Sequence, residues 1–258
     1  MAVAAPVLLR PTTVGAGACG DDVDGVRVAC ACGDLVVSNT ILSATDPIVS
    51  QPCAGDGLAV AAPHGGAGLI LDLAGLSLVG TGEGIGLRVV RGGEGGAVIV
   101  GGDGGTRATI ARFRTGIAAS GSTVVKELRD VDLIANVEDG MHIRTSGMLA
   151  ESVTAQRNGA DGMRVSGHGS SLIDVEASEN LGSGLRVGGT GATIRARSTA
   201  NRANGAVVTG RGHDLTNSEL SDNGAAGVMA SGRGHAVSGV RVEGNERGGV
   251  AGRRGAVQ

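Results

Sequence analysis

Six side chains in the middle of the chain have the types needed for acid–base chemistry on an anionic ligand: Asp139, His142, Arg144, Asp161, Arg164 and Arg186. Carboxylates and histidine transfer protons, and guanidinium groups bind anions through paired hydrogen bonds. Their spacing is regular, since 22 residues separate Asp139 from Asp161 and Arg164 from Arg186. Stacked at the spacing of neighbouring β-strands, they form one patch that spans roughly 10 Å. The interpretation that we favour is that these charges simply balance one another on a solvated sheet face, and catalysis is the alternative.

Such a patch requires a repeating fold, and a repeat runs from Asn136 to Gly249. One asparagine column recurs in steps of 22, 22, 21, 22 and 22 residues, and a glycine follows each asparagine four residues later. A fixed period of this size is typical of repeat proteins. The asparagines are Asn136, Asn158, Asn180, Asn201, Asn223 and Asn245.

Apolar residues on both sides of each asparagine alternate with polar or small ones, which is the spacing of β-strands. In the first repeat Val131 and Leu133 precede Asn136, and Met141 and Ile143 follow it. A coil of about 22 residues cannot bury its apolar face alone, but stacked coils can. The sequence therefore predicts an all-β fold, a single-stranded parallel β-helix (solenoid).

The asparagine column is interpreted as a structural ladder at a turn rather than as a catalytic feature. Asparagine tolerates the left-handed backbone region, and stacked amides bond to one another at strand spacing. The glycine column continues back through Gly116, Gly86 and Gly57 in longer steps of 24, 30 and 29 residues. With a period of 21–24 residues in the C-terminal part, this column predicts about nine coils.

The predicted organisation has three parts: an N-terminal loop or cap segment with the cysteines (residues 1–32), the β-helix (33–252) and a short basic tail (253–258). No amphipathic cap follows the last coil, which leaves an unpaired strand edge. Arg253 and Arg254 are interpreted as charges that block this edge. Both a monomer and end-to-end self-association are compatible with such an end.

Four cysteines precede the repeat: Cys19, Cys30, Cys32 and Cys53. An even number in one segment favours two disulfides and an oxidising compartment. A metal site is a weaker alternative because the chain has no CxxC pair, and free thiols are the third. The N-terminus lacks a basic region, and Pro6 interrupts its short apolar stretch, so it is not a convincing signal peptide. We therefore expect a secreted or cell-surface protein whose true start lies upstream or was trimmed.

Composition excludes several classes of function. A net charge of −3 argues against dedicated nucleic-acid binding, and no apolar run reaches the roughly 18 residues of a membrane span. No cofactor and no metal are expected. His213 and His235 are 22 residues apart and can stack, but no acidic or sulfur ligand shares their column. We expect these two histidines, and His168, to lie in a solvent-exposed turn.

Two regions of the chain resemble bacterial right-handed parallel β-helix repeat proteins of the pectin-lyase-like superfamily. One region is the Asn–Gly repeat itself. The other is the opening, with Cys32-Gly33-Asp34, Asp56-Gly57-Leu58, Leu71-Asp72-Leu73 and Gly80-x-Gly82-x-Gly84-Ile85. Together they cover about residues 32–252. The chain departs from the family after Leu-Asp-Leu, where Ala74-Gly75-Leu76 replaces the usual Asn-Gly-His turn.

The resemblance implies a right-handed coil and a disulfide pairing. It places Cys32 and Cys53 at the two ends of the first strand–loop unit, whereas Cys19 and Cys30 flank an Asp-rich loop. The favoured disulfides are therefore Cys32–Cys53 and Cys19–Cys30. The next choice is Cys30–Cys53 with Cys19–Cys32. Enzymes of the superfamily place their sites on a comparable outer groove. The carboxylate clusters of pectinolytic enzymes and the His-Asp motifs of mannuronan epimerases are not visible in this chain.

Two classes of function follow. The first is a non-catalytic extracellular or surface β-helix, a scaffold or binding module with a polysaccharide or a surface protein as partner. The alternative is a carbohydrate-active enzyme, similar to a polysaccharide lyase or epimerase, that uses the outer face of coils four to six. Sugar-binding grooves often rely on aromatic platforms, and Phe113 is the only aromatic residue, which favours the first class. The fold alone does not decide, because one fold hosts many functions.

Overall fold

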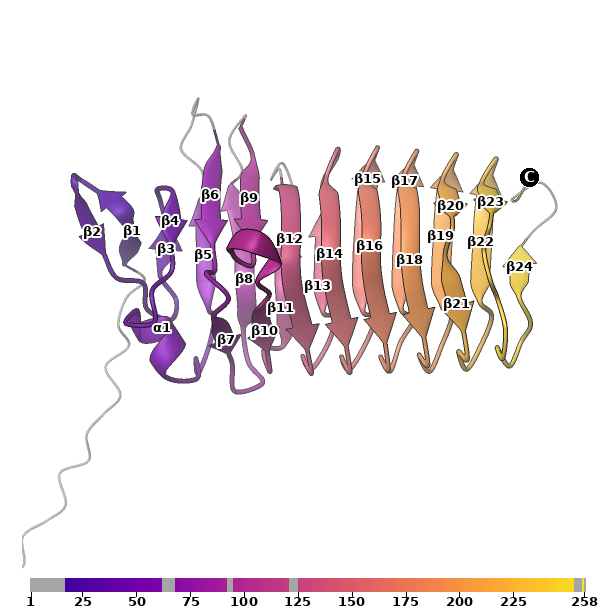
Figure 1. Cartoon of the computed structure of the whole chain (residues 1–258), viewed down its shortest axis with the longest axis horizontal. Coiled ribbons are helices and arrows are strands. Elements are labelled where there is room, and N and C mark those ends of the chain that lie inside the picture. Colours follow the sequence, from indigo (N-terminus) through magenta and orange to yellow (C-terminus); the bar gives the residue numbers. More distant parts are fainter. Residues whose placement is uncertain (1–16, 62–67, 92–94, 121–124, 253–256, 258) are drawn as a thin grey trace, which may run out of the picture.

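The chain winds into a right-handed parallel β-helix whose coils stack in sequence order along the long axis (Figure 1). The computed structural model describes residues 17–61, 68–91, 95–120, 125–252 and 257. Helix is almost absent from this part of the chain, since α1 (Pro47–Ser50) and η1 (Asp103–Gly105) have only 4 and 3 residues. Among the described residues no helix has the length and apolarity needed to cross a membrane. The predicted all-β solenoid is confirmed.

Two sheets of 12 strands each form the walls of the solenoid. The first sheet has the order β2 (Val26–Val28), β1 (Ala18–Val23), β3 (Leu35–Val36), β5 (Leu58–Ala61), β8 (Ile85–Arg91), β11 (Thr115–Ala119), β13 (Met141–Arg144), β15 (Met163–His168), β17 (Leu185–Thr190), β19 (Ala206–Arg211), β22 (Val228–Arg233) and β24 (Val250–Gly252). Its strands pair in parallel except β1 and β2, which form an antiparallel pair.

The second sheet has the order β23 (Ala236–Ser238), β20 (Asp214–Thr216), β18 (Thr193–Thr199), β16 (Ser171–Ser178), β14 (Leu149–Gln156), β12 (Val125–Ile134), β9 (Ala97–Val100), β6 (Leu69–Asp72) and β4 (Thr40–Ile41). Three further strands lie off this path: β7 (Ser77–Val79) pairs with β10 (Ala108–Ala111), β10 pairs with β12, and β21 (Glu219–Ser221) pairs with β18. Each coil therefore contributes one strand or strand pair to each wall.

Equivalent residues of successive coils lie side by side, as the repeat predicted. Met141 pairs with Met163, and both side chains are fully buried. The glycine column marks the tightest contact between coils, because a Cβ atom on Gly140 would lie only 2.6 Å from the carbonyl oxygen of Gly162. The same contact links glycine to glycine through nine coils, from Gly57 to Gly249. A side chain in this column would push the coils apart.

The asparagine column forms a continuous hydrogen-bonded ladder. The backbone N–H and the side-chain amide of Asn158 both donate to Oδ1 of Asn180, each at 3.0 Å. The same two bonds join each of the six asparagines to the next. Phe113 precedes the first asparagine, and its N–H donates to Oδ1 of Asn136 at 3.1 Å. The predicted ladder is confirmed.

The ladder asparagines do not adopt the left-handed backbone conformation that the sequence suggested for them. The left-handed backbone conformation falls on the residue before each ladder asparagine, for example Ala135 (φ 54°), Arg157 (φ 56°) and Glu179 (φ 56°). The asparagines themselves are not among the residues with positive φ. What the column requires of asparagine is its amide, which supplies a donor and an acceptor at one site.

Two disulfides hold the N-terminal end, Cys19–Cys30 and Cys32–Cys53, with Cα–Cα distances of 5.1 and 5.5 Å. This is the pairing that the resemblance favoured. The expectation of a loop before residue 33 was wrong for β1 and β2, because β1 pairs in parallel with β3 and so begins the first sheet. Arg253 and Arg254 of the predicted tail lie outside the described residues.

Candidate functional site

The predicted patch lies on the outer face of the first sheet, on β13, β15 and β17. The strand register places His142 beside Arg164, and Arg164 beside Arg186. Successive side chains of a strand point to opposite faces, so Met141 is buried in the core while its neighbour His142 is exposed. The structure therefore brings together the three side chains that the repeat placed in one column.

The two aspartates of the patch are buried, although a solvated sheet face was expected for them. Asp139 is 6% exposed and Asp161 is 3% exposed. Oδ1 of Asp139 accepts the backbone N–H of Asp161 at 2.9 Å, and Oδ1 of Asp161 accepts that of Ser183 at 2.9 Å. One oxygen of each carboxylate thus joins two coils, as the asparagine ladder does, and this structural bond explains the burial.

The second oxygen of Asp161 holds two arginines of the outer face. Oδ2 accepts Nη2 of Arg164 at 2.8 Å and Nε of Arg186 at 2.7 Å. Burial by itself would raise the pKa of Asp161, but the hydrogen bonds from Arg186 and Arg164 outweigh it and lower the pKa below its ordinary value of 3.8. Asp161 is therefore a fixed anion that orients two guanidinium groups.

The second oxygen of Asp139 is less well paired. Oδ2 lies 3.6 Å from Nδ1 of His142 and 3.6 Å from Nε of Arg164. Burial raises the pKa of Asp139 above its ordinary value of 3.8, and the charge of Arg164 offsets this only in part. Nε of Arg164 is itself buried and has no hydrogen-bond partner among the described residues. Asp139 and Asp161 thus have pKa values that shift in opposite directions one coil apart.

Arg144 and the residues that continue the column beyond Arg186 differ in exposure. Arg144 is exposed at the end of β13, and no ion pair is found for it within the part of the chain that the structure describes. In the register, Val207 follows Arg186 and is only 6% exposed, whereas Met229 one coil further is 48% exposed. The column that contains His142, Arg164 and Arg186 is therefore basic from β13 to β17 and apolar on β19 and β22.

We expect Asp161→Ala to destabilise the fold more than Asp161→Asn. Alanine leaves the buried N–H of Ser183 without an acceptor, which costs about 1–3 kcal/mol. Asparagine keeps an acceptor oxygen for this N–H, but it loses the charge and the second acceptor oxygen, which binds Arg164 and Arg186. Because the folded pKa of Asp161 is lowered, its contribution to stability is present above pH 3.8 and is lost as the pH falls through the folded pKa. Urea denaturation at pH 7 and under acid conditions measures both effects. Equal losses for the two variants at pH 7 would contradict the structural role of Oδ1.

Sequence reasoning missed a second pair of the same design nearer the N-terminus. Oδ1 of Asp56 accepts the N–H of Ile85 at 2.8 Å, and Oδ2 lies 2.9 Å from Nη2 of Arg88. The signal was present, because Asp56 stands directly before Gly57, as Asp139 stands before Gly140. Ala118 separates Arg88 from His142 in the strand register, so this pair does not join the patch.

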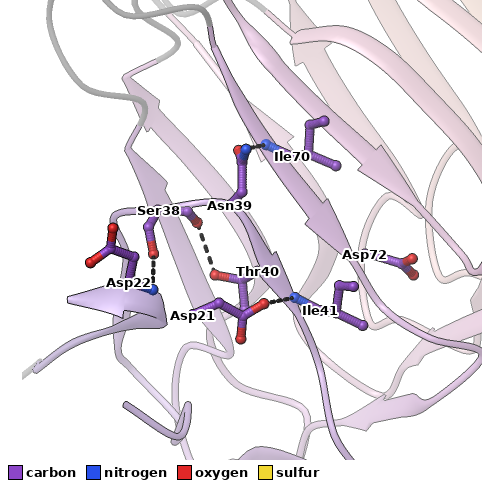
Figure 2. Close-up of a pocket in the computed structure, with 8 residues that line it drawn as sticks. All are labelled: Asp21, Asp22, Ser38, Asn39, Thr40, Ile41, Ile70 and Asp72. Atoms are coloured by element: carbon purple, nitrogen blue, oxygen red, sulfur yellow. Dashed lines mark hydrogen bonds between the residues drawn. The ribbon is translucent and has the colours of Figure 1, made fainter. Parts of the chain in front are cut away.

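A surface groove of about 550 Å³ lies at the N-terminal end, beside β1 and β4 (Figure 2). Each of its three carboxylates already accepts a backbone N–H, as Asp21 does from Ile41 and Asp72 from Ala74, both at 2.8 Å. The sequence did not reveal this groove, because its walls come from coils outside the regular repeat. Its acidic lining is unsuited to an anionic ligand. The lining residues are Asp21, Asp22, Ser38, Asn39, Thr40, Ile41, Ile70 and Asp72.

His213 and His235 stack, with ring centroids 5.1 Å apart and an interplanar angle of 15°. The exposed turn expected for them was wrong, since each is only 1% exposed, whereas His168 is exposed. Both nitrogens of both rings have protein partners. No group of three or more histidine, cysteine or acidic side chains in the described part of the chain could hold a metal ion.

No protein-family model matches this chain, and no curated protein matches it either. Several solved structures are similar to it. The A-module of mannuronan C-5 epimerase AlgE6 from Azotobacter vinelandii is 16% identical, with 87% of this chain and 80% of that chain covered and a TM-score of 0.42. A mutant of the periplasmic alginate epimerase AlgG is 12% identical, with coverages of 86% and 68% and a TM-score of 0.46.

The catalytic domain of a GH87 α-1,3-glucanase in complex with nigerose is 10% identical, with 99% of this chain and 71% of that chain covered and a TM-score of 0.22. At such identities the similarity concerns the fold alone.

Proposed function

We propose that this protein is a carbohydrate-active β-helix of the pectin-lyase-like superfamily that binds an acidic polysaccharide on the outer face of the first sheet. We further propose that Asp139 and His142 transfer a proton there, as in an epimerase or a lyase. The two disulfides support an extracellular or cell-surface location, because disulfides persist in oxidising compartments.

The observation that carries the proposal is the column of His142, Arg164 and Arg186 on the outer face, next to two buried carboxyl groups whose pKa values shift in opposite directions. Pairs of acids whose environments separate their pKa values are typical of acid–base sites. Asp161 stays ionised and fixes Arg164 and Arg186, while the raised pKa of Asp139 brings it closer to the range in which it can exchange a proton.

The chemistry that suits this arrangement is proton removal from the carbon next to a uronate carboxylate. In this proposal Arg144, which has no ion pair among the described residues, binds that carboxylate and makes the neighbouring C–H more acidic. The carboxyl group of Asp139 lies 3.6 Å from Nδ1 of His142, so it favours a proton on that nitrogen and leaves Nε2 to take the proton from the sugar. Return of a proton from water to the opposite face inverts the carbon. Alternatively, the electron pair forms a C4–C5 double bond and expels the glycosidic oxygen, which takes a proton from water, and the chain is cleaved.

A second candidate is binding without catalysis, the first class that the sequence favoured. One observation favours it: Oδ1 of both aspartates is used to join coils, so these residues have a structural reason to be present. The basic column is then an anion-binding surface for the polysaccharide. The two candidates predict the same ligand and differ only in whether a proton is exchanged.

We expect the protein, incubated with polyuronates in deuterated buffer, to exchange the hydrogen at C5 of the sugar for deuterium. Mass spectrometry or proton NMR detects this exchange in both an epimerase and a lyase, and ultraviolet absorbance of unsaturated uronides distinguishes the lyase. His142→Gln and Asp139→Asn should each lower the exchange rate by at least about 100-fold, the usual contribution of a general acid or base. A neutral glucan serves as the substrate control.

The matched control variant is Arg195→Gln, which removes an exposed ion pair with Asp174 on the second sheet. It should bind polyuronate and exchange C5 hydrogen as the wild type does. Binding without exchange, measured by calorimetry, would select the non-catalytic module. The proposed function is refuted if the protein neither binds nor exchanges hydrogen with any of the polyuronates tested.

A further inference from the structure

The stacked histidines lie in a column of the core that small or apolar side chains fill in earlier coils. The strand register places His213 and His235 after Met148, Ser170 and Ala192, each one residue before a strand of the second sheet. All five are at most 3% exposed. Two titratable rings therefore occupy an interior position between β19, β20, β22 and β23, in the C-terminal coils.

Each ring joins its own coil to the preceding one. Nδ1 of His213 accepts the backbone N–H of Ala192 at 3.1 Å, and Nδ1 of His235 accepts that of His213 at 3.3 Å. The Nε2 atoms lie 3.0 Å from the carbonyl oxygen of Thr209 and 3.1 Å from that of Ser231. Since Nδ1 accepts and Nε2 donates, these bonds require both rings to be neutral.

Protonation is incompatible with this arrangement. A proton on Nδ1 would meet the backbone N–H that already points at it, and a second protonated ring would lie stacked 5.1 Å away. Burial lowers the pKa of His213 below its ordinary value of 6.5, and His235 lowers it further, although hydrogen bonds to the carbonyls of Thr209 and Gly189 and the charge of Asp214 act the other way. Arg211 and Arg233, which end β19 and β22, are the other charged groups on these elements.

We propose that His213 and His235 form an acid-sensitive lock that holds the C-terminal coils together when neutral and releases them when protonated. At neutral pH the hydrogen bonds from Ala192 to His213 and from His213 to His235 hold the neighbouring coils together. The ring of His213 is protonated readily only when these bonds are open, so acid favours the open form. The lock is independent of the proposed site, which lies on the first sheet from β13 to β17.

The direction of the pH dependence follows from linkage. An imidazole that is exposed by opening binds a proton near pH 6.5, whereas the closed form of His213 binds it only at lower pH. The stabilising contribution is therefore present above about pH 6.5 and is lost as the pH falls below it. The asparagine ladder does not titrate, so coils without these histidines lack this dependence.

Hydrogen–deuterium exchange of the full chain at pH 7.5 and pH 5.0, with intrinsic exchange rates corrected for pH, tests the lock. Protection of amides in residues 206–238 should fall by about tenfold or more at pH 5.0. Protection in residues 125–165, which carry the asparagine ladder without buried histidine, should change much less. Equal protection of residues 206–238 at the two pH values would overturn the proposal.

The double variant His213→Asn/His235→Asn separates titration from general acid sensitivity. Asparagine places an acceptor oxygen near the position of Nδ1 but does not titrate, so the acid-induced loss of protection should disappear. His168 is an exposed histidine at the end of β15, two coils before His213, and the His168→Asn variant should keep the wild-type pH dependence. A double variant that remains as acid-sensitive as the wild type would refute the lock. If it does not fold, the wild-type exchange by itself decides.

Discussion

Replacing Cys32 and Cys53 by alanine is expected to lower the free energy of unfolding of the N-terminal coils by about 3 kcal/mol. The bond closes a sequence separation of 21 residues, and the chain-entropy estimate for such a loop is about 3 kcal/mol. Cys53 is fully buried and its N–H donates to Val79, so this bond also pins the first coil to the next. Guanidinium denaturation of the oxidised protein, followed by circular dichroism, measures the loss.

The second disulfide is the matched comparison. Cys19–Cys30 closes a separation of 11 residues, so its removal should cost slightly less by the same estimate. Non-reducing peptide mapping checks the pairing directly. Four alkylatable thiols in protein recovered without reductant from its native compartment would disprove both bonds. They would also remove the argument for an extracellular location.

Asn180→Ala is expected to destabilise the protein by about 1–3 kcal/mol, because it interrupts the ladder at its centre. Oδ1 of Asn180 accepts two donors from Asn158, and its own amide donates to Asn201 and to the carbonyl of Ala155. Alanine leaves the buried N–H of Asn158 without an acceptor. Urea denaturation gives the loss in free energy, and hydrogen exchange of the coils on both sides locates it.

Asn245→Ala provides the control at the end of the same column. Its Oδ1 also accepts two donors, from Asn223, but Asn245 is only partly buried, so water can replace the missing acceptor. We therefore expect a smaller loss than for Asn180→Ala. Equal losses for the two variants would show that burial of the ladder contributes nothing to its strength.

The residues of the proposed site could be located from the sequence, but the pKa shifts of their carboxyl groups could not be predicted from it. The spacing placed Asp139, His142 and Arg164 together, and their contacts agree. The opposite pKa shifts of Asp139 and Asp161 were not predictable, because they depend on which oxygen of each carboxylate accepts a backbone N–H and on how many arginines reach the other. These contacts join residues of different coils, so the sequence of one coil does not predict them.

The repeat by itself determined the parallel β-helix, the number of coils and the residues that stack. The physical reason is that a constant step between like residues leaves one register in which asparagine meets asparagine and glycine meets glycine. Only the tertiary structure decided what lacks this periodicity. The strands β1 and β2 are one example, because β1 pairs with β2 in a hairpin and with β3 at a sequence separation shorter than the repeat.

Burial of polar side chains was also decided only by the tertiary structure. The 22-residue spacing of His213 and His235 shows that they stack, but not that they are buried. Their burial is possible because backbone N–H and C=O groups form hydrogen bonds with both nitrogens of each ring. The residue before each ladder asparagine has the left-handed backbone conformation, and in this turn the amide of the asparagine contacts the next coil. A sequence period shows which residues stack, whereas the backbone groups that face them decide which side chains are buried.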